Sequence, residues 1–233
     1  MKHRLSFWLI FACAGMLLAT GHAGADMYTI TDAYTGLPSF NGGPFLINGE
    51  KLTFCLERTE YFNPGGTYYG TIDEFADGGG ADGALDDPNK DYLDSTTAWL
   101  YSDFINNQAN YSSPYQQIAL QLAIWALEDE FGASWSTLIG YAEYNGIATS
   151  SSYTFDGKTI GQWANLYYLA ALAQEQSGPT NIMVLNLYGD LAHTQKKQSQ
   201  LISVPEPSIL LLLGTGLVGL AFALKRSRKR VCK

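Results

Sequence analysis

The chain has 233 residues, of which 13% are aromatic, and a formal net charge of -8. All 22 acidic residues lie between Asp26 and Glu206, together with only 6 of the 14 Lys and Arg residues, which gives this central part a net charge of about -16. Nucleic acid and anionic lipid head groups are poor partners for an acidic domain of this kind, whereas basic surfaces, divalent cations and neutral glycans remain open.

The first 25 residues have the order of a cleavable secretory signal. A basic start at residues 1–4 precedes an apolar run at residues 5–18, and the small residues Ala23 and Ala25 follow. This order predicts export with cleavage after Ala25. A retained membrane anchor is the alternative, although the apolar run is short for a membrane span.

Short strands and hairpins are predicted for residues 27–72, which are rich in Tyr, Thr, Phe and Gly and contain turn sequences such as Asn48-Gly49. One strand is expected at residues 52–57. Alternation places Cys55 and Glu57 on its more polar face.

Cys55 is the only cysteine of the predicted exported part, because Cys13 lies in the signal and Cys232 in the basic tail. A lone thiol in an oxidising compartment has to be deeply buried or chemically occupied. His193 is the only histidine left, so Cys/His zinc clusters are excluded and a histidine-based catalytic pair would require His193 itself.

Residues 73–94 are acidic and rich in glycine, and we expect a loop there. Asp87, Asn89 and Asp91 imitate the start of a calcium loop, but Tyr92 stands where that pattern needs Gly. A solvated acidic loop without bound metal is the alternative interpretation.

Helices are predicted at residues 98–108, 114–131 and 160–176 from capping residues and apolar periodicity. The second is apolar almost all round and is therefore expected to be buried on most sides, with Gln117, Gln121 and Glu128 as a narrow polar strip.

The C-terminal third of the chain ends in a distinctive order of segments. A strand is predicted at residues 181–187, and residues 193–203 form a polar spacer or the last strand of a sheet. The motif Val204-Pro205-Glu206-Pro207-Ser208 follows. The apolar run after it, residues 208–224, is long enough with its flanks to be a membrane helix, and residues 225–233 form a basic tail.

This C-terminal order resembles the PEP-CTERM sorting signal of Gram-negative bacteria that make exopolysaccharide. The resemblance implies recognition and removal of the tail by an exosortase-type membrane enzyme. Before this processing the protein would be held in the inner membrane by its C-terminal helix, and after it the protein would reach the cell surface or the extracellular matrix.

A second resemblance concerns Phe54-Cys55-Leu56 together with Gln121-Leu122-Ala123-Ile124-Trp125, which are similar to the paired motifs of thioester domains from bacterial surface adhesins. It implies a thioester between the Cys55 thiol and the Gln121 acyl group, with Phe54 and Trp125 as shields. Family members usually carry Thr or Gln where this chain has Leu120, so a domain that keeps the fold without the bond is the alternative.

A Cys thiolate that attacks a Gln carboxamide expels ammonia and leaves an electrophile, which a surface or matrix nucleophile can open. Gln117, one helical turn before Gln121, is an alternative acyl donor. Without the bond, the protein would be a biofilm module that binds polysaccharide or calcium non-covalently. We expect no cofactor and no enzymatic turnover, although carboxylate pairs such as Glu57 with Glu128, or Glu128 with Glu130, would suit a hydrolase.

The sequence thus predicts an α+β protein with an antiparallel β-sheet or barrel, a small helical subdomain, an N-terminal signal helix and a C-terminal transmembrane helix. The predicted organisation is a signal peptide (residues 1–25), a thioester-like domain (26–192), a spacer or last strand (193–203) and a sorting signal (204–233).

Overall fold

The computed structural model describes residues 26–34, 42–78, 89–131, 146–174, 179, 181–205 and 213–219. The expected signal segment at residues 1–25 lies outside this range. Of the expected membrane helix at residues 208–224, only residues 213–219 are described, and they are helical. Within the described parts of the chain, no helix has the length and apolar character needed to cross a membrane.

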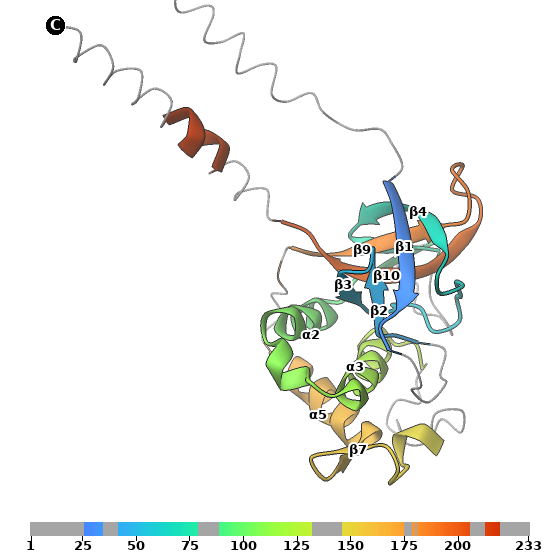
Figure 1. The fold of residues 1–233 in the computed structure, drawn as a ribbon, viewed down its shortest axis with the longest axis vertical. Helices are drawn as coiled ribbons and strands as arrows, with labels where there is room; N and C mark the ends of the chain where they lie inside the picture. Colours follow the sequence, from blue (N-terminus) through green and yellow to red (C-terminus); the bar gives the residue numbers. More distant parts are fainter. Residues whose placement is uncertain are drawn as a thin grey trace, which may run out of the picture.

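Six antiparallel strands form the main sheet, in the order β10-β9-β4-β1-β2-β3 (Figure 1). The turn between β2 and β3 contains Asn48 and Gly49 at φ values of 53° and 74°, which explains why the sequence uses Asn and Gly there. The strands span Asp26–Asp32 (β1), Phe45–Ile47 (β2), Lys51–Thr53 (β3), Thr67–Asp73 (β4), Ile182–Tyr188 (β9) and Lys196–Ser203 (β10).

The two outer strands in this order meet each other along a short contact, which we call the seam and define as residues 53–56 and 199–201. The N–H of Leu201 donates to the carbonyl of Phe54, and the N–H of Leu56 donates to that of Ser199, both at 3.0 Å. Cys55 and Gln200 form the bridge between these two bonds. The chain after β3 therefore pairs with β10, and Cys55 lies at the centre of the pairing.

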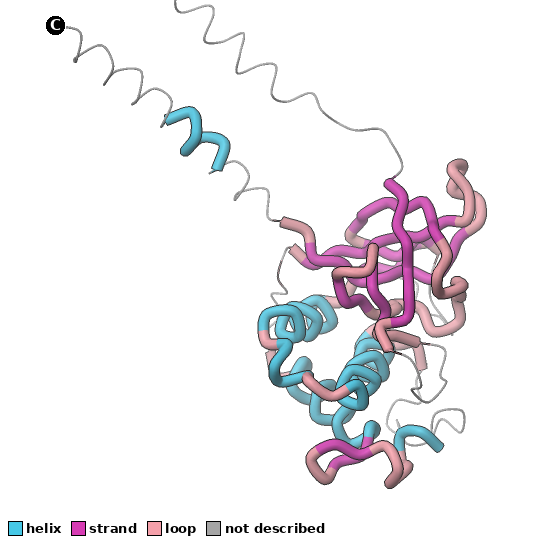
Figure 2. The backbone as a smooth tube through the Cα atoms, viewed as in Figure 1, coloured by secondary structure: helices cyan, strands magenta, loops and turns pink. Residues whose placement is uncertain are grey.

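Three helices pack together on one side of the sheet, below it in the views of Figures 1 and 2. Helix α3 is the most deeply buried of the three, since every residue from Gln116 to Leu127 is buried, as its apolar surface predicts. The helical elements are α2 (Ser95–Asn106), a short 3-10 helix (Gln108–Tyr111), α3 (Pro114–Leu127) and α5 (Ile160–Leu172).

The start of α3 is fixed by its sequence and its end by backbone geometry. Ser113 and Gln116 form a capping box, with Pro114 at the first helical position. The helix ends at Leu127, four residues before the predicted end, because Asp129 adopts a left-handed φ of 55°. The described mixture of helices and antiparallel sheet confirms the α+β class.

Other predicted boundaries require correction. Residues 73–94, expected to be a loop, include the paired strands β5 (Phe75–Asp77) and β6 (Lys90–Tyr92), where the rings of Phe75 and Tyr92 pack 5.6 Å apart. Helix α2 begins three residues before its predicted start, and α5 ends four residues before its predicted end. A further small hairpin joins β7 (Thr154–Phe155) to β8 (Lys158–Thr159).

The interpretation of residues 193–203 as a polar spacer is wrong, and the alternative of a last strand is right over β10. Gln198, Ser199 and Gln200 are polar yet at most 2% exposed. They are tolerated inside the protein because each makes a hydrogen bond there. For example, the Ser199 hydroxyl donates to the side-chain oxygen of Asn186 at 2.9 Å.

Replacing the α3 cap with Ser113→Ala should lower the free energy of unfolding by about 1 kcal/mol, because the N–H of Tyr115 loses its acceptor at the helix start. Chemical denaturation of both proteins measures the difference. Ser151→Ala, at an exposed turn position, is the matched control and should leave stability unchanged. Equal losses in the two variants would contradict the role of the cap.

Candidate functional site

Cys55 and Gln121 lie in direct contact, although 66 residues separate them in the sequence. The Gln121 side-chain oxygen accepts the N–H of Cys55 at 2.8 Å and the N–H of Gly43 at 3.0 Å. Its amide nitrogen donates to the carbonyl of Cys55 at 2.8 Å. Both side chains are completely buried, so this amide joins helix α3 to the seam of the sheet.

Gly43 is needed at this place because it has no side chain. A Cβ built on it would lie 3.0 Å from the Gln121 oxygen and 3.2 Å from the carbonyl oxygen of Thr53, closer than nearly all such contacts. The absence of that carbon lets the backbone N–H of Gly43 approach the amide oxygen. Two backbone donors thus converge on one carbonyl oxygen, an arrangement that stabilises developing negative charge on it.

The Cys55 thiol accepts a hydrogen bond from the side-chain amide nitrogen of Gln200 at 3.3 Å. Burial raises the pKa of this thiol to about 12, and the charge of Glu57 adds to the rise, while hydrogen bonds from Gln200 and the Gly43 backbone oppose it. Since this pKa lies far above 7, the thiol is protonated at neutral pH.

The other residues of the predicted thioester motif are also buried. The Phe54 ring packs edge-on against Phe104 of α2, with ring centres 5.2 Å apart, and the Trp125 ring packs against Phe131 at 6.3 Å. Their role as shields stays a prediction. Gln117 donates to the carbonyl of Tyr111 at 3.0 Å, so among the glutamines of α3 the structure brings Gln121 to Cys55.

Sequence reasoning missed Gln200. It lies in the polar run that we interpreted as a spacer, and a single polar run does not reveal which of its members turn inward. The signal that could have found it is the pair Gln198 and Gln200, two residues apart just before the apolar Leu201 and Ile202, since alternate residues of a strand share one face.

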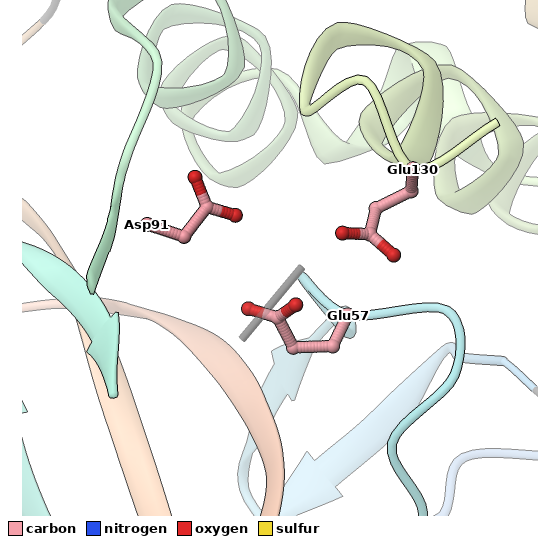
Figure 3. Close-up of side chains that lie close together, drawn as sticks. All are labelled: Glu57, Asp91 and Glu130. Atoms are coloured by element: carbon pink, nitrogen blue, oxygen red, sulfur yellow. The ribbon is translucent and has the colours of Figure 1, made fainter. Parts of the chain in front are cut away.

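A second candidate site consists of the side chains of Glu57, Asp91 and Glu130, which we call the carboxylate cluster. Figure 3 shows their carboxyl groups turned toward one another. An oxygen of each lies within 4.8 Å of the others, and none is more than 8% exposed. Carboxylate oxygens at this spacing are ligands that a divalent cation such as Ca²⁺ prefers. One oxygen of Glu130 already accepts the N–H of Arg58 at 2.8 Å.

Of the three residues predicted to begin a calcium loop at residues 87–91, the structure describes Asn89 and Asp91. Asp87 lies outside the described residues, and Asn89 occupies a left-handed turn position with φ of 74°. Asp91 belongs to β6 and to the carboxylate cluster.

The carboxylates that would form hydrolase pairs have different surroundings. Glu128 accepts the backbone N–H of Asp94 at 3.3 Å, and burial raises its pKa well above the usual value. Glu57 and Glu130 belong to the carboxylate cluster. His193, the remaining candidate base, lies in the β9–β10 connection with its ring stacked 4.3 Å from that of Tyr188.

Residues 203–229 match the family model described as the PEP-CTERM protein-sorting motif. The comparisons with curated proteins and with solved structures give no match. The motif confirms the predicted sorting signal, and it implies export, recognition by an exosortase-type membrane enzyme and a processing step at the membrane before the protein reaches the cell surface. It begins at Ser203, the last residue of β10, so the signal directly follows the sheet.

Gly43→Ala should destabilise the protein by about 1–3 kcal/mol, because the added methyl group crowds the Gln121 oxygen and the Thr53 carbonyl. Denaturant unfolding measures the loss. Gly146→Ala is the control, since nothing lies within 4 Å of a Cβ placed there. A Gly43→Ala protein as stable as the control would show that the approach of the backbone to Gln121 is not tight.

Glu60 supplies a pH-dependent prediction. Burial, assisted by the charges of Glu130 and Asp77 and partly offset by Lys196, raises its pKa from 4.5 to about 7. The folded state therefore favours the protonated form, a preference that is fully present below pH 4.5 and is lost as the pH rises through about 7.

Glu60→Gln should consequently raise the melting temperature relative to wild type at about pH 8 and leave it nearly unchanged at about pH 4, since the amide never acquires the buried charge. Thermal unfolding at both values tests this. Glu50→Gln, at an exposed position, should show no such pH dependence. A constant difference between wild type and Glu60→Gln at the two pH values would overturn the assignment.

Proposed function

We propose that this exported protein attaches covalently to nucleophiles of the matrix or of a neighbouring surface through an internal thioester between Cys55 and Gln121. The observation that carries the proposal is the placement of the Gln121 amide, which three hydrogen bonds hold against the backbone of Cys55 and Gly43. A carboxamide fixed against the backbone of a cysteine, with two N–H donors on its oxygen, resembles a reactant held for attack.

The reaction that this geometry suits is an acyl transfer within the chain. The sulfur of Cys55 attacks the side-chain carbonyl carbon of Gln121, and the oxygen carries the developing negative charge toward the N–H groups of Gly43 and Cys55. The carbon–nitrogen bond then breaks, the thiol proton passes to the leaving nitrogen, and ammonia departs. The product is a thioester with one new carbon–sulfur bond.

A partner amine would open the thioester at the same carbonyl carbon. An amide bond to the partner forms, the carbon–sulfur bond breaks, and the Cys55 thiol is regenerated with the proton from the amine. Each chain reacts once, so the protein would be an attachment protein and not an enzyme. Complete burial of Cys55 and Gln121 supports the proposal, because it shelters an activated acyl group from water.

The second candidate is a non-covalent structural module of the biofilm, in which Gln121 only fastens helix α3 to the sheet. Two observations favour it. The Gln121 amide is already satisfied at both its oxygen and its nitrogen, and burial keeps the Cys55 thiol protonated at neutral pH. In this case the carboxylate cluster would supply a cation site for the same module.

Mass spectrometry of the purified full-length chain distinguishes the two candidates. A thioester makes the protein lighter than its sequence by one ammonia, and peptide analysis should locate the loss at Cys55 and Gln121. Methylamine should then add to Gln121 and release a Cys55 thiol that can be alkylated.

Gln121→Ala and Cys55→Ser should each abolish both the ammonia loss and the methylamine adduct. Gln117→Ala is the matched control on α3 and should retain them, since Gln117 contacts Tyr111 instead of Cys55. An unmodified wild-type mass, with Cys55 free to react after unfolding, would reject the thioester and leave the non-covalent module.

A further inference from the structure

We propose that Gln200 is a positioning residue for the Cys55 thiol. Its side chain aligns the sulfur for attack, and it accepts a hydrogen bond from the ammonia that leaves or from the amine that enters. This inference rests on the proposed thioester, and it assigns to β10 a part in the chemistry that the motif residues after β3 and on α3 do not supply.

The backbone fixes Gln200 opposite Cys55. The two residues form the bridge of the seam, and the hydrogen bonds on either side of it hold their backbones in register. The side-chain nitrogen of Gln200 donates to the Cys55 sulfur at 3.3 Å and lies 3.4 Å from the carbonyl oxygen of Gln198. An N–H donor aimed at sulfur stabilises the thiolate relative to the thiol.

The side-chain oxygen of the Gln200 amide is more informative than its nitrogen. The side-chain oxygen of Gln200 is buried and has no hydrogen-bond partner among the described residues, and the whole residue is 0% exposed. A buried carbonyl oxygen without a donor is destabilising, and such atoms are few in folded proteins. This oxygen belongs to the amide whose nitrogen contacts the Cys55 thiol, so we take it as an acceptor for an N–H group that is present only during the reaction.

Thioester formation supplies such a group. When the sulfur attacks, its proton is transferred to the Gln121 nitrogen, and the carbon–nitrogen bond breaks to release ammonia. The departing ammonia can donate one N–H to the Gln200 oxygen while the Gln200 nitrogen remains on the sulfur. In the opening reaction an incoming amine takes the same place, and the Gln200 nitrogen stabilises the departing thiolate.

Gln198 shows what a merely structural glutamine on this strand looks like. It is also buried, at 2% exposed, and lies two residues away on the same strand. Its side-chain nitrogen donates to the backbone carbonyl of Glu57, and its side-chain oxygen is not one of the buried unpaired atoms found among the described residues. It therefore provides a matched control of the same residue type, strand and burial.

The test compares wild type, Gln200→Met and Gln198→Met as full-length chains. Methionine keeps the volume of the side chain but has neither the donor nor the acceptor. The rate of methylamine addition to Gln121, measured by mass spectrometry across a range of pH, should fall about tenfold in Gln200→Met, which corresponds to the loss of one hydrogen bond to a charged group. Gln198→Met should react at the wild-type rate with the wild-type pH profile.

Gln200→Glu serves if Gln200→Met fails to fold. Its neutral acid form can still donate to the sulfur, whereas its ionised form repels the thiolate, so the reaction rate should decline with rising pH where wild type shows no decline. A structural role alone would not produce this change in the pH profile.

The outcomes separate the two proposals. A wild-type chain without ammonia loss overturns the thioester and this inference with it. A wild-type chain that carries the bond, with folded Gln200→Met or Gln200→Glu variants that react at the wild-type rate and pH profile, overturns the role of Gln200 alone.

Discussion

The contact between the Gln121 amide and the backbone of Cys55 is the interaction on which the arrangement of this protein depends. It is the hydrogen-bonded link between the most buried helix and the seam that joins the outer strands of the sheet. Because the amide is enclosed on all sides, each of its polar atoms has to be matched by the backbone, and the N–H groups of Cys55 and Gly43 and the carbonyl of Cys55 meet that demand. This requirement fixes the position of α3 relative to the sheet, and it also places a carboxamide against the backbone of the cysteine.

Strand β10 connects three features of the molecule. Its residues close the seam, its Gln200 side chain contacts the Cys55 sulfur, and its last residue, Ser203, begins the match to the sorting motif. The N–H of Val204 still donates to the carbonyl of Asn181 at 2.9 Å, so ordered pairing continues into the sorting signal. A processing enzyme that acts on this signal would consequently meet the folded sheet within a few residues, and any fraying of β10 would also disturb the contacts of Cys55.

Buried polarity is concentrated around this junction. Glu57 follows the seam directly, its backbone carbonyl accepts from Gln198, and its carboxyl group turns toward Asp91 and Glu130. Burying several carboxyl groups and amides close together has a free-energy cost, which hydrogen bonding or a bound cation offsets. A domain selected only for stability would place apolar residues there. The seam and the carboxylate cluster supply the polar groups on which the two proposed functions rest.

The sequence by itself determined the C-terminal sorting motif, the α+β class, the burial of α3 and the residue types of the Cys55 and Gln121 motifs, because local order, periodicity and composition carry that information. The pairing of β5 with β6 and the burial of β10 were decided by tertiary structure, since polar strands become buried only when partners from distant segments satisfy them. For the same reason, sequence periodicity could not distinguish Gln121 from Gln117, nor identify Gln200. Only the fold determines which amides lie against Cys55, because that depends on how the helix and the two edges of the sheet meet in space.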